Sequence, residues 1–238
     1  GTYTASGALR RLMWLRKGPI LAAVYPVIVL LLQLLVGLVI GSAVARALLA
    51  AYAWLLGLVG VEAAAGVAGW IGWGVGWAVT LALAWYVLRW FRARDGKLFA
   101  WYLMHDFAFA AGRRGAYPAA LEERLSTFGD RIAEALTEDV DEVLVVGHSS
   151  GAQLAVSVLA DLIRAGRVPQ GGAALSLLTL GHAIPMVSFL PKAARLRADL
   201  QYLSETDALA WVDESAPGDG CSIAQSAPQE VTGVAPVV

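Results

Sequence analysis

The sequence predicts two membrane-spanning helices followed by an α/β domain, and three observations lead to this fold class. Residues 18–45 and 63–88 contain no charged side chain over 28 and 26 consecutive positions. Of the 238 residues, 58% are hydrophobic and 16% are charged, whereas soluble domains average about 45–50% and about 25%. Beyond residue 97, short apolar runs alternate with helical patterns, as they do in α/β layer folds.

Charge divides the chain into two parts. Residues 1–94 contain eight Lys and Arg but one acidic residue, whereas residues 95–238 contain ten basic and eighteen acidic residues. The net charges of +7 and −8 favour a membrane anchor, 1–97, followed by a cytoplasmic domain, 98–238. Nucleic acid is not expected as a partner, because phosphate binding requires a basic surface. The single cysteine excludes an intrachain disulfide.

Each uncharged stretch is long enough to cross a bilayer, which takes about 20 residues in helical form. In lipid the backbone must satisfy its own hydrogen bonds, so we expect helices at about 18–45 and 63–90. Pro26 is expected to bend the first helix near one end. The connection, 47–61, is apolar but short, and we interpret it as a reentrant or interfacial helix or as a continuation of the two spans.

Basic residues flank the outer ends of both spans. They are Arg10, Arg11, Arg16 and Lys17 before the first, and Arg89, Arg92, Arg94 and Lys97 after the second. Because positive flanks stay on the cytoplasmic side, the pattern predicts a multi-pass protein of the inner (cytoplasmic) membrane with both termini in the cytoplasm.

Small and aromatic residues recur at helical spacing within the spans. The small residues form two G-x-x-x-G patterns, Gly37/Gly41 and Gly72/Gly76, and the aromatic residues are Trp70, Trp73 and Trp77. Small residues let helix backbones approach closely, so they favour packing within the hairpin or docking on other membrane subunits. Trp70 is expected to be an interfacial anchor. Trp73 and Trp77 lie deeper and are expected to contact lipid or a partner helix, with a bound pigment or quinone as the alternative.

The α/β domain is expected to contain four strands. They are predicted at 97–104, 142–146, 174–180 and 208–212, with helices after Pro118 and at 152–165 and a loop and helix at 185–203. The second strand leads directly into Gly147-His148-Ser149-Ser150-Gly151, a G-x-S-x-G sequence. A strand before this sequence and a helix after it are the context of a nucleophile elbow, in which a sharp turn exposes the serine hydroxyl. The alternative interpretation is a structural turn.

These residues resemble the α/β-hydrolases of the lipase and esterase branch, over roughly residues 97–221. The resemblance implies a partial parallel sheet of that fold, with Ser149 as nucleophile and the Ser150 N–H as an oxyanion donor. It implies that His148 packs in the elbow, with Gly147 and Gly151 as its small flanking residues.

The resemblance also places a catalytic acid after a later strand. Residues 211–219, WVDESAPGD, are similar to the strand and turn that carry this acid in fungal-type lipases and intracellular phospholipases. We therefore expect Asp219 as the acid and Asp213 as its reserve. The alternative is that Asp219 is an ordinary turn residue.

The three histidines do not complete this pattern. The family places its histidine after the acid, and no histidine follows Asp219. His182 follows a strand end and would be an irregular base, while His105 could line the pocket or pack in a loop. Either the sequence stops before a last strand and its histidine, so that the domain is incomplete at its C-terminus, or catalysis has been lost.

The segment between Pro185 and Pro191 is apolar and is followed by basic residues. It contains Met186, Val187, Phe189 and Leu190, and the basic residues are Lys192, Arg195 and Arg197. We expect it to rest on an anionic leaflet, to act as a lid, or to pack into the core.

The resemblance implies a membrane-anchored serine hydrolase acting on an ester, with a lipid ester as one candidate substrate. The alternative hypothesis is a catalytically silent accessory or scaffolding subunit of a membrane complex, docked through the glycine and tryptophan faces. No metal or other cofactor is expected, because no cluster of His, Cys and carboxylates has ligand spacing.

Overall fold

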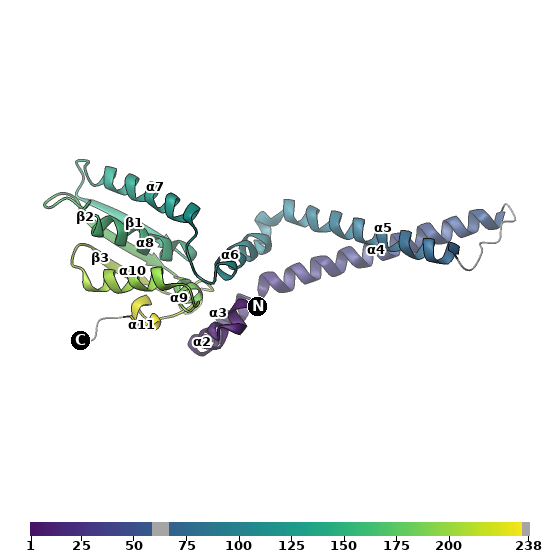
Figure 1. Cartoon of the computed structure of the whole chain (residues 1–238), viewed down its shortest axis with the longest axis horizontal. Coiled ribbons are helices and arrows are strands. Elements are labelled where there is room, and N and C mark those ends of the chain that lie inside the picture. Colours follow the sequence, from purple (N-terminus) through teal and green to yellow (C-terminus); the bar gives the residue numbers. More distant parts are fainter. Residues whose placement is uncertain (59–66, 235–238) are drawn as a thin grey trace. The chain divides into compact units, whose positions relative to one another are not determined.

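A computed structural model describes residues 1–58 and 67–234. The chain forms two compact units, Val24–Asp106 and Gly1–Ala23 with Phe107–Val238, which we call the helical unit and the α/β unit (Figure 1). The N-terminal 23 residues therefore pack with the α/β unit, although they precede the first long helix in sequence.

The helical unit contains α4 (Tyr25–Leu58), α5 (Val67–Ala93), a 3₁₀ turn η1 (Asp95–Lys97) and the start of α6 (Ala100–Gly112). The α/β unit begins with α1 (Thr2–Ala5), α2 (Ala8–Leu15) and α3 (Lys17–Ala22). It continues after α6 with α7 (Ala119–Ala135), β1 (Glu142–His148), α8 (Ser150–Arg164), β2 (Ala174–Leu180), α9 (Ile184–Ser188), α10 (Ala194–Glu205), β3 (Ala210–Glu214) and α11 (Pro228–Thr232).

The two long helices, α4 and α5, pack side by side through small residues (Figure 1). A Cβ atom added to Gly37 would lie 2.9 Å from Ala84 Cα, and one added to Gly41 would lie 2.5 Å from Thr80 O. The first predicted G-x-x-x-G pair therefore packs within the hairpin. A Cβ atom added to Gly72 or Gly76 would lie 3.9 or 3.4 Å from the Leu49 side chain, which is a looser contact.

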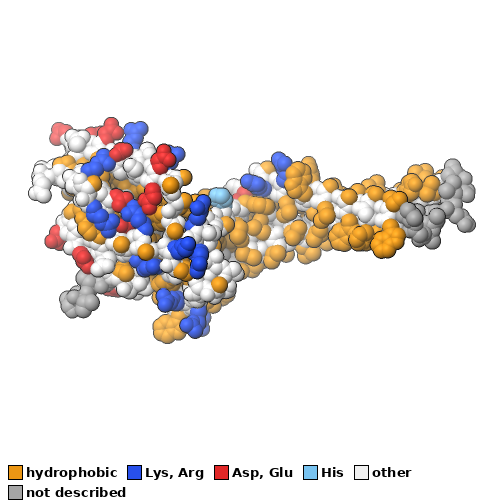
Figure 2. All heavy atoms as spheres, viewed as in Figure 1, with side chains coloured by type: hydrophobic (Ala, Val, Ile, Leu, Met, Phe, Trp, Pro, Cys, Tyr) orange, Lys and Arg blue, Asp and Glu red, His pale blue; other side chains and the backbone are white. Residues whose placement is uncertain are grey.

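Two stretches are long and apolar enough to cross a membrane, Lys17–Leu58 and Gly69–Ala93. Hydrophobic side chains cover most of the visible surface of α4 and α5 in Figure 2. The predicted tryptophan face lies on this surface, with Trp70 and Trp73 76% and 64% exposed. Such exposure would be costly in water, so the surface is suited to an apolar solvent.

The first membrane-length stretch begins at Lys17, close to its predicted start, but continues to Leu58 and is interrupted between α3 and α4. Pro26 lies in the first turn of α4, where its missing N–H costs no hydrogen bond. Residues 47–58 continue α4 as a helix, in agreement with the expected continuation of the span, and 59–66 lie outside the described residues.

The strand predicted at 97–104 is wrong, because this segment forms the end of η1 and the start of α6. The Asp95 carboxylate accepts hydrogen bonds from the backbone N–H groups of Trp101 and Tyr102, at 3.1 and 2.8 Å. The two N–H groups belong to the first turn of α6, where a helix has no backbone carbonyl to accept their hydrogen bonds. The Trp101 indole also donates to Gln33 Oε1 of α4 at 3.1 Å.

The α/β unit is built on a three-stranded parallel sheet in the order β1-β2-β3. The strand at 174–180 is confirmed, and β3 begins two residues later than predicted. In the pairing register, Gly147 lies beside Thr179 and Thr179 beside Asp213. The carboxyl ends of all three strands therefore meet at one edge of the sheet.

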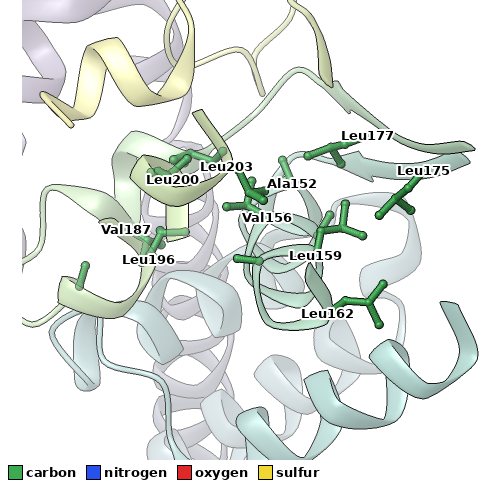
Figure 3. Close-up of a cluster of buried hydrophobic side chains, with 14 of the residues drawn as sticks. Ala152, Val156, Leu159, Leu162, Leu175, Leu177, Val187, Leu196, Leu200 and Leu203 are labelled. Atoms are coloured by element: carbon green, nitrogen blue, oxygen red, sulfur yellow. The ribbon is translucent and has the colours of Figure 1, made fainter. Parts of the chain in front are cut away.

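One face of the sheet is covered by α8, and α7 and α10 pack against α8. The predicted helix after Pro118 is confirmed as α7. Figure 3 shows Val156, Leu159 and Leu162 of α8 directed toward Leu175 and Leu177 of β2, with leucines of α10 completing the cluster. The exposed fractions of these buried side chains are 4% or less.

The opposite face is open in the described part of the chain. Leu144, Val146 and Val212 share this face and are 51–52% exposed. The apolar sequence of β1 predicts a strand buried on both faces, but in the described chain only one face is covered.

Candidate functional site

Ser149 lies between β1 and α8 in a rare backbone conformation. Its φ of 54° and ψ of −121° place a non-glycine residue in the positive-φ region. Such a conformation costs of order 1–3 kcal/mol and persists only where the surrounding structure imposes it. The predicted strand–serine–helix turn is present, with the strained residue at the predicted nucleophile position.

The two flanking glycines differ in their surroundings. A Cβ atom on Gly147 would lie 2.7 Å from Ala152 Cα, whereas one on Gly151 would meet nothing within 4 Å. The elbow therefore requires glycine before the serine, because β1 and the first turn of α8 approach closely there. Gly151 has no comparable steric requirement.

The end of β2 holds Ser149 through the backbone. The Ser149 N–H donates to Leu180 O at 3.2 Å, and the Ala183 N–H donates to Ser149 O at 3.3 Å. His182 lies between these two contacts in sequence. The structure thus brings the backbone of His182 beside the candidate nucleophile.

The His182 side chain is fully buried, and its partner carboxylate belongs to Asp213. The distance from His182 Nε2 to Asp213 Oδ2 is 3.7 Å. Thr179 donates its hydroxyl to Asp213 Oδ1 and accepts a 3.1 Å hydrogen bond from the Trp211 indole. Burial lowers the pKa of His182, while the charge of Asp213 acts in the opposite direction.

Asp219 occupies a tight loop after β3. Its Oδ2 accepts a hydrogen bond from the Ser222 hydroxyl at 2.7 Å, and its Oδ1 accepts the Cys221 N–H at 3.0 Å. Desolvation opposes ionisation of Asp219, but these bonds and the nearby His148 lower its pKa overall. Gly181, with φ of +52°, leaves room for this carboxylate, which a Cβ atom at that position would overlap.

The structure therefore distributes the predicted residues over two acid–histidine neighbourhoods. The reserve acid Asp213 lies beside His182, and the first choice, Asp219, lies within electrostatic range of His148. His148 is exposed at the end of β1. Its proximity to Asp219 follows from the alignment of strand ends, which the sequence alone does not reveal.

The two predicted pocket residues have different positions. Ser150 is the first residue of α8, in agreement with an elbow followed directly by a helix. His105 lies on α6 in the helical unit, whereas Ser149 lies in the α/β unit. The expected role of His105 depended on a strand at 97–104, and that strand is absent.

The sequence did not indicate that the N-terminal segment α2–α3 packs against the loops after β2 and β3. Leu12 of α2 and Ile20 of α3 are buried against Ala183 and Ile223, which neighbour His182 and the Asp219 loop. The Arg16 guanidinium donates to Ser222 O and Pro217 O, each at 2.5 Å. Ala8 and Leu12 are four residues apart, so they share one face of a helix, and this spacing could have indicated that the face is buried.

A cavity of about 360 Å³ lies beside the acid loop. It is lined by Arg16, Lys17, Gly18, Pro19, Ala22 and residues 217–220. Asp219 is among these residues and Ser149 is not.

The apolar segment at 186–190 packs into the core, which is the third of its predicted roles. Val187 and Leu190 are 7% and 0% exposed. Arg197 donates to the backbone carbonyls of Ser188 and Leu190, and Arg195 pairs with Glu122 and Asp161. These arginines are therefore not available to a membrane surface.

Comparison with known proteins finds no match to this chain among protein-family models, curated proteins or solved structures. Within residues 1–58 and 67–234, no group of three or more His, Cys, Asp or Glu side chains could hold a metal ion.

Proposed function

We propose that this protein is a membrane-anchored serine hydrolase of the lipase or esterase type, with Ser149 as its nucleophile. The observation that carries the proposal is the strained backbone of Ser149 at the junction of β1 and α8. Backbone strain of this kind clusters at active sites, and a strand–serine–helix turn is the geometry that exposes a nucleophilic hydroxyl.

In the proposed reaction, Ser149 Oγ attacks the ester carbonyl carbon and its proton passes to His182. The N-terminus of α8, which carries partial positive charge, favours the negative charge that develops on the carbonyl oxygen. The intermediate then expels the alcohol, which takes the proton from His182. Water, deprotonated by His182, hydrolyses the acyl-enzyme and restores Ser149.

Asp213 is proposed as the group that orients His182 and stabilises its charged form, because its carboxylate is 3.7 Å from Nε2. The ring of His182 is fully buried, so the side chains around it must move before substrate can reach it. Asp219, the acid that the sequence favoured, is the reserve. The apolar surface of α4 and α5 favours a substrate that enters from a bilayer, such as a lipid ester.

The second proposal is a catalytically silent subunit of a membrane complex. Two observations favour it. The histidine beside Asp213, His182, is fully buried. The carboxylate of Asp219 is hydrogen-bonded to Ser222 and Cys221 and not to a histidine. In that case the exposed tryptophans of α5 are candidates for the contact with other subunits.

A fluorophosphonate probe separates the two proposals. We expect the full-length protein in membranes to be labelled, Ser149→Ala to lose labelling, and the neighbouring Ser150→Ala to retain it. His182→Asn should reduce the labelling rate much more than His148→Asn. Absence of labelling in folded, membrane-inserted protein would refute the hydrolase proposal and support the silent subunit.

A further inference from the structure

The helix α2 presents two unlike faces. Ala8 and Leu12 are buried against the α/β unit, whereas Arg10, Arg11 and Trp14 are exposed, Trp14 by 90%. Hydrophobic and basic side chains project together at the position of α2 in Figure 2. Trp14 is not isolated on the outer face, because it lines a cavity together with Leu15, Phe189 and Val231, and contiguous exposed apolar surface marks interaction sites.

A cavity of about 590 Å³ lies on this outer side of α2. Its lining combines two cations with apolar walls: Arg10, Arg11, Trp14, Leu15, Phe189, Val231 and Thr232. The guanidinium of Arg11 lies 5.9 Å from the centre of the Phe189 ring. The cavity therefore offers positive charge next to a surface for hydrocarbon.

The basic residues of this segment lack acidic partners within the described residues. Arg164, Arg167 and Arg195 of the same unit each pair with aspartate, whereas Arg10 and Arg11 form no ion pair among residues 1–58 and 67–234, and Arg16 bonds to backbone carbonyls. No acidic residue occurs between positions 1 and 61. An anion from outside the described chain could therefore pair with Arg10 and Arg11 without displacing an existing ion pair.

The position of the segment in the sequence indicates the source of that charge. The first membrane-length stretch begins at Lys17, directly after Arg16. Anionic lipids attract basic residues that immediately precede a span, and tryptophan favours the boundary between headgroups and acyl chains.

We propose that the cavity of Arg10, Arg11, Trp14 and Phe189 binds an anionic glycerophospholipid of the membrane that holds the first span. The arginines contact the headgroup phosphate, and Trp14, Leu15 and Val231 contact the start of an acyl chain. The proposal depends on the membrane placement of the spans and not on Ser149 acting as a nucleophile. Binding there would hold α2 in place, and with it the contacts that Leu12 and Ile20 make with Ala183 and Ile223, which lie next to His182 and the Asp219 loop in sequence.

The test uses the full chain in a neutral detergent, with phosphatidylglycerol and phosphatidylcholine of matched acyl chains as probes and native mass spectrometry as the readout. We expect retention of phosphatidylglycerol over phosphatidylcholine. Arg10→Gln with Arg11→Gln should weaken that binding roughly thirtyfold, because each arginine near an anionic surface contributes about a fivefold gain in affinity. Arg124→Gln with Arg131→Gln on α7 is the charge-matched control and should bind as the unmodified chain does.

Trp14→Ser provides a second variant, because it keeps both arginines and removes the apolar contact. It should weaken binding of the lipid but not of inorganic phosphate. Equal retention of both lipids, unchanged binding in the double arginine variant, or full competition by inorganic phosphate would overturn the proposal. Ser149→Ala should leave lipid binding unchanged. Failure of the hydrolase proposal can therefore be distinguished from failure of the lipid-binding proposal.

Discussion

The helical and α/β units use the same kinds of apolar residue in opposite ways. In α4 and α5 the leucines, valines and tryptophans face outward, and the helices meet through Gly37 and Gly41. In the α/β unit the leucines of α8 and α10 are buried, and the charges outside them form ion pairs. The difference is the one expected if α4 and α5 lie in lipid and the α/β unit in water, since apolar packing drives association in water but close backbone contact does so in lipid.

The largest effect that would sharpen this comparison is expected in the ion-pair network of the α/β unit. Asp199 is 1% exposed, and its Oδ1 lies 2.5 Å from Arg164 Nη1 and 3.5 Å from Arg195 Nη1. Asp199→Ala removes the buried carboxylate that these two arginines share, while both keep contacts with Asp161. We therefore expect a loss of about 3 kcal/mol in the free energy of unfolding, at the lower end for a broken buried pair. Chemical denaturation of the full chain in detergent measures it.

Glu134→Ala is the control for that substitution. Glu134 pairs with Arg131 at 3.4 Å on the surface of α7, and exposed pairs contribute about 0–1 kcal/mol. Equal losses from the two variants would contradict the assignment of Asp199 to a buried network.

The next effect concerns the helical unit. Gly41→Ala would place a Cβ atom 2.5 Å from Thr80 O, so the two helices must separate, at a cost of about 2–3 kcal/mol. Gly74→Ala is the matched control, because a Cβ atom there meets nothing within 4 Å and alanine is the better helix former. Thermal unfolding in detergent should rank Gly41→Ala below the unmodified chain and Gly74→Ala level with it or above. The reverse ranking would show that α4 and α5 do not pack at Gly41.

A smaller effect is expected at the elbow. Gly147→Ala forces β1 away from Ala152, and we expect a loss of about 1–2 kcal/mol together with slower probe labelling of Ser149. Gly151→Ala should change neither quantity. If both substitutions are equally tolerated, the close approach of β1 to α8 is incorrect.

The effect that is smallest near neutral pH is a pH dependence that the α/β unit should show. Burial lowers the pKa of His182 below its usual 6.5, so below that pH the unfolded chain binds a proton that the folded chain resists. Stability is thus complete above pH 6.5 and falls as the pH decreases toward the folded-state value, by up to about 1.4 kcal/mol per pH unit. Denaturation between pH 7.5 and 5 measures the slope, which His182→Gln should reduce. An unchanged slope in that variant would assign the dependence to other groups.

The sequence predicted those features that local patterns determine. The limits of β2, the helix after Pro118 and the turn at Ser149 follow from hydrophobic periodicity and from glycine positions. The segment 97–104 was misassigned because its apolar and aromatic residues suit a strand as well as a helix. The contacts of Asp95 and Gln33 that stabilise α6 come from other positions in the chain.

The arrangement of the candidate site depended on contacts between distant residues. Asp213 lies beside His182 because β2 and β3 are adjacent in register, whereas the turn sequence alone favoured Asp219. The cover formed by Leu12 and Ile20 joins positions about 200 residues from Ile223, and no periodicity in either segment reveals that pairing.

The central claim is that Ser149 is an activated nucleophile, and its most direct test is to map the fluorophosphonate adduct on the intact protein by mass spectrometry. We expect a single adduct on Ser149, formed in membranes and abolished by prior denaturation. An adduct on Ser150 or another serine, or no adduct on natively folded protein, would contradict it.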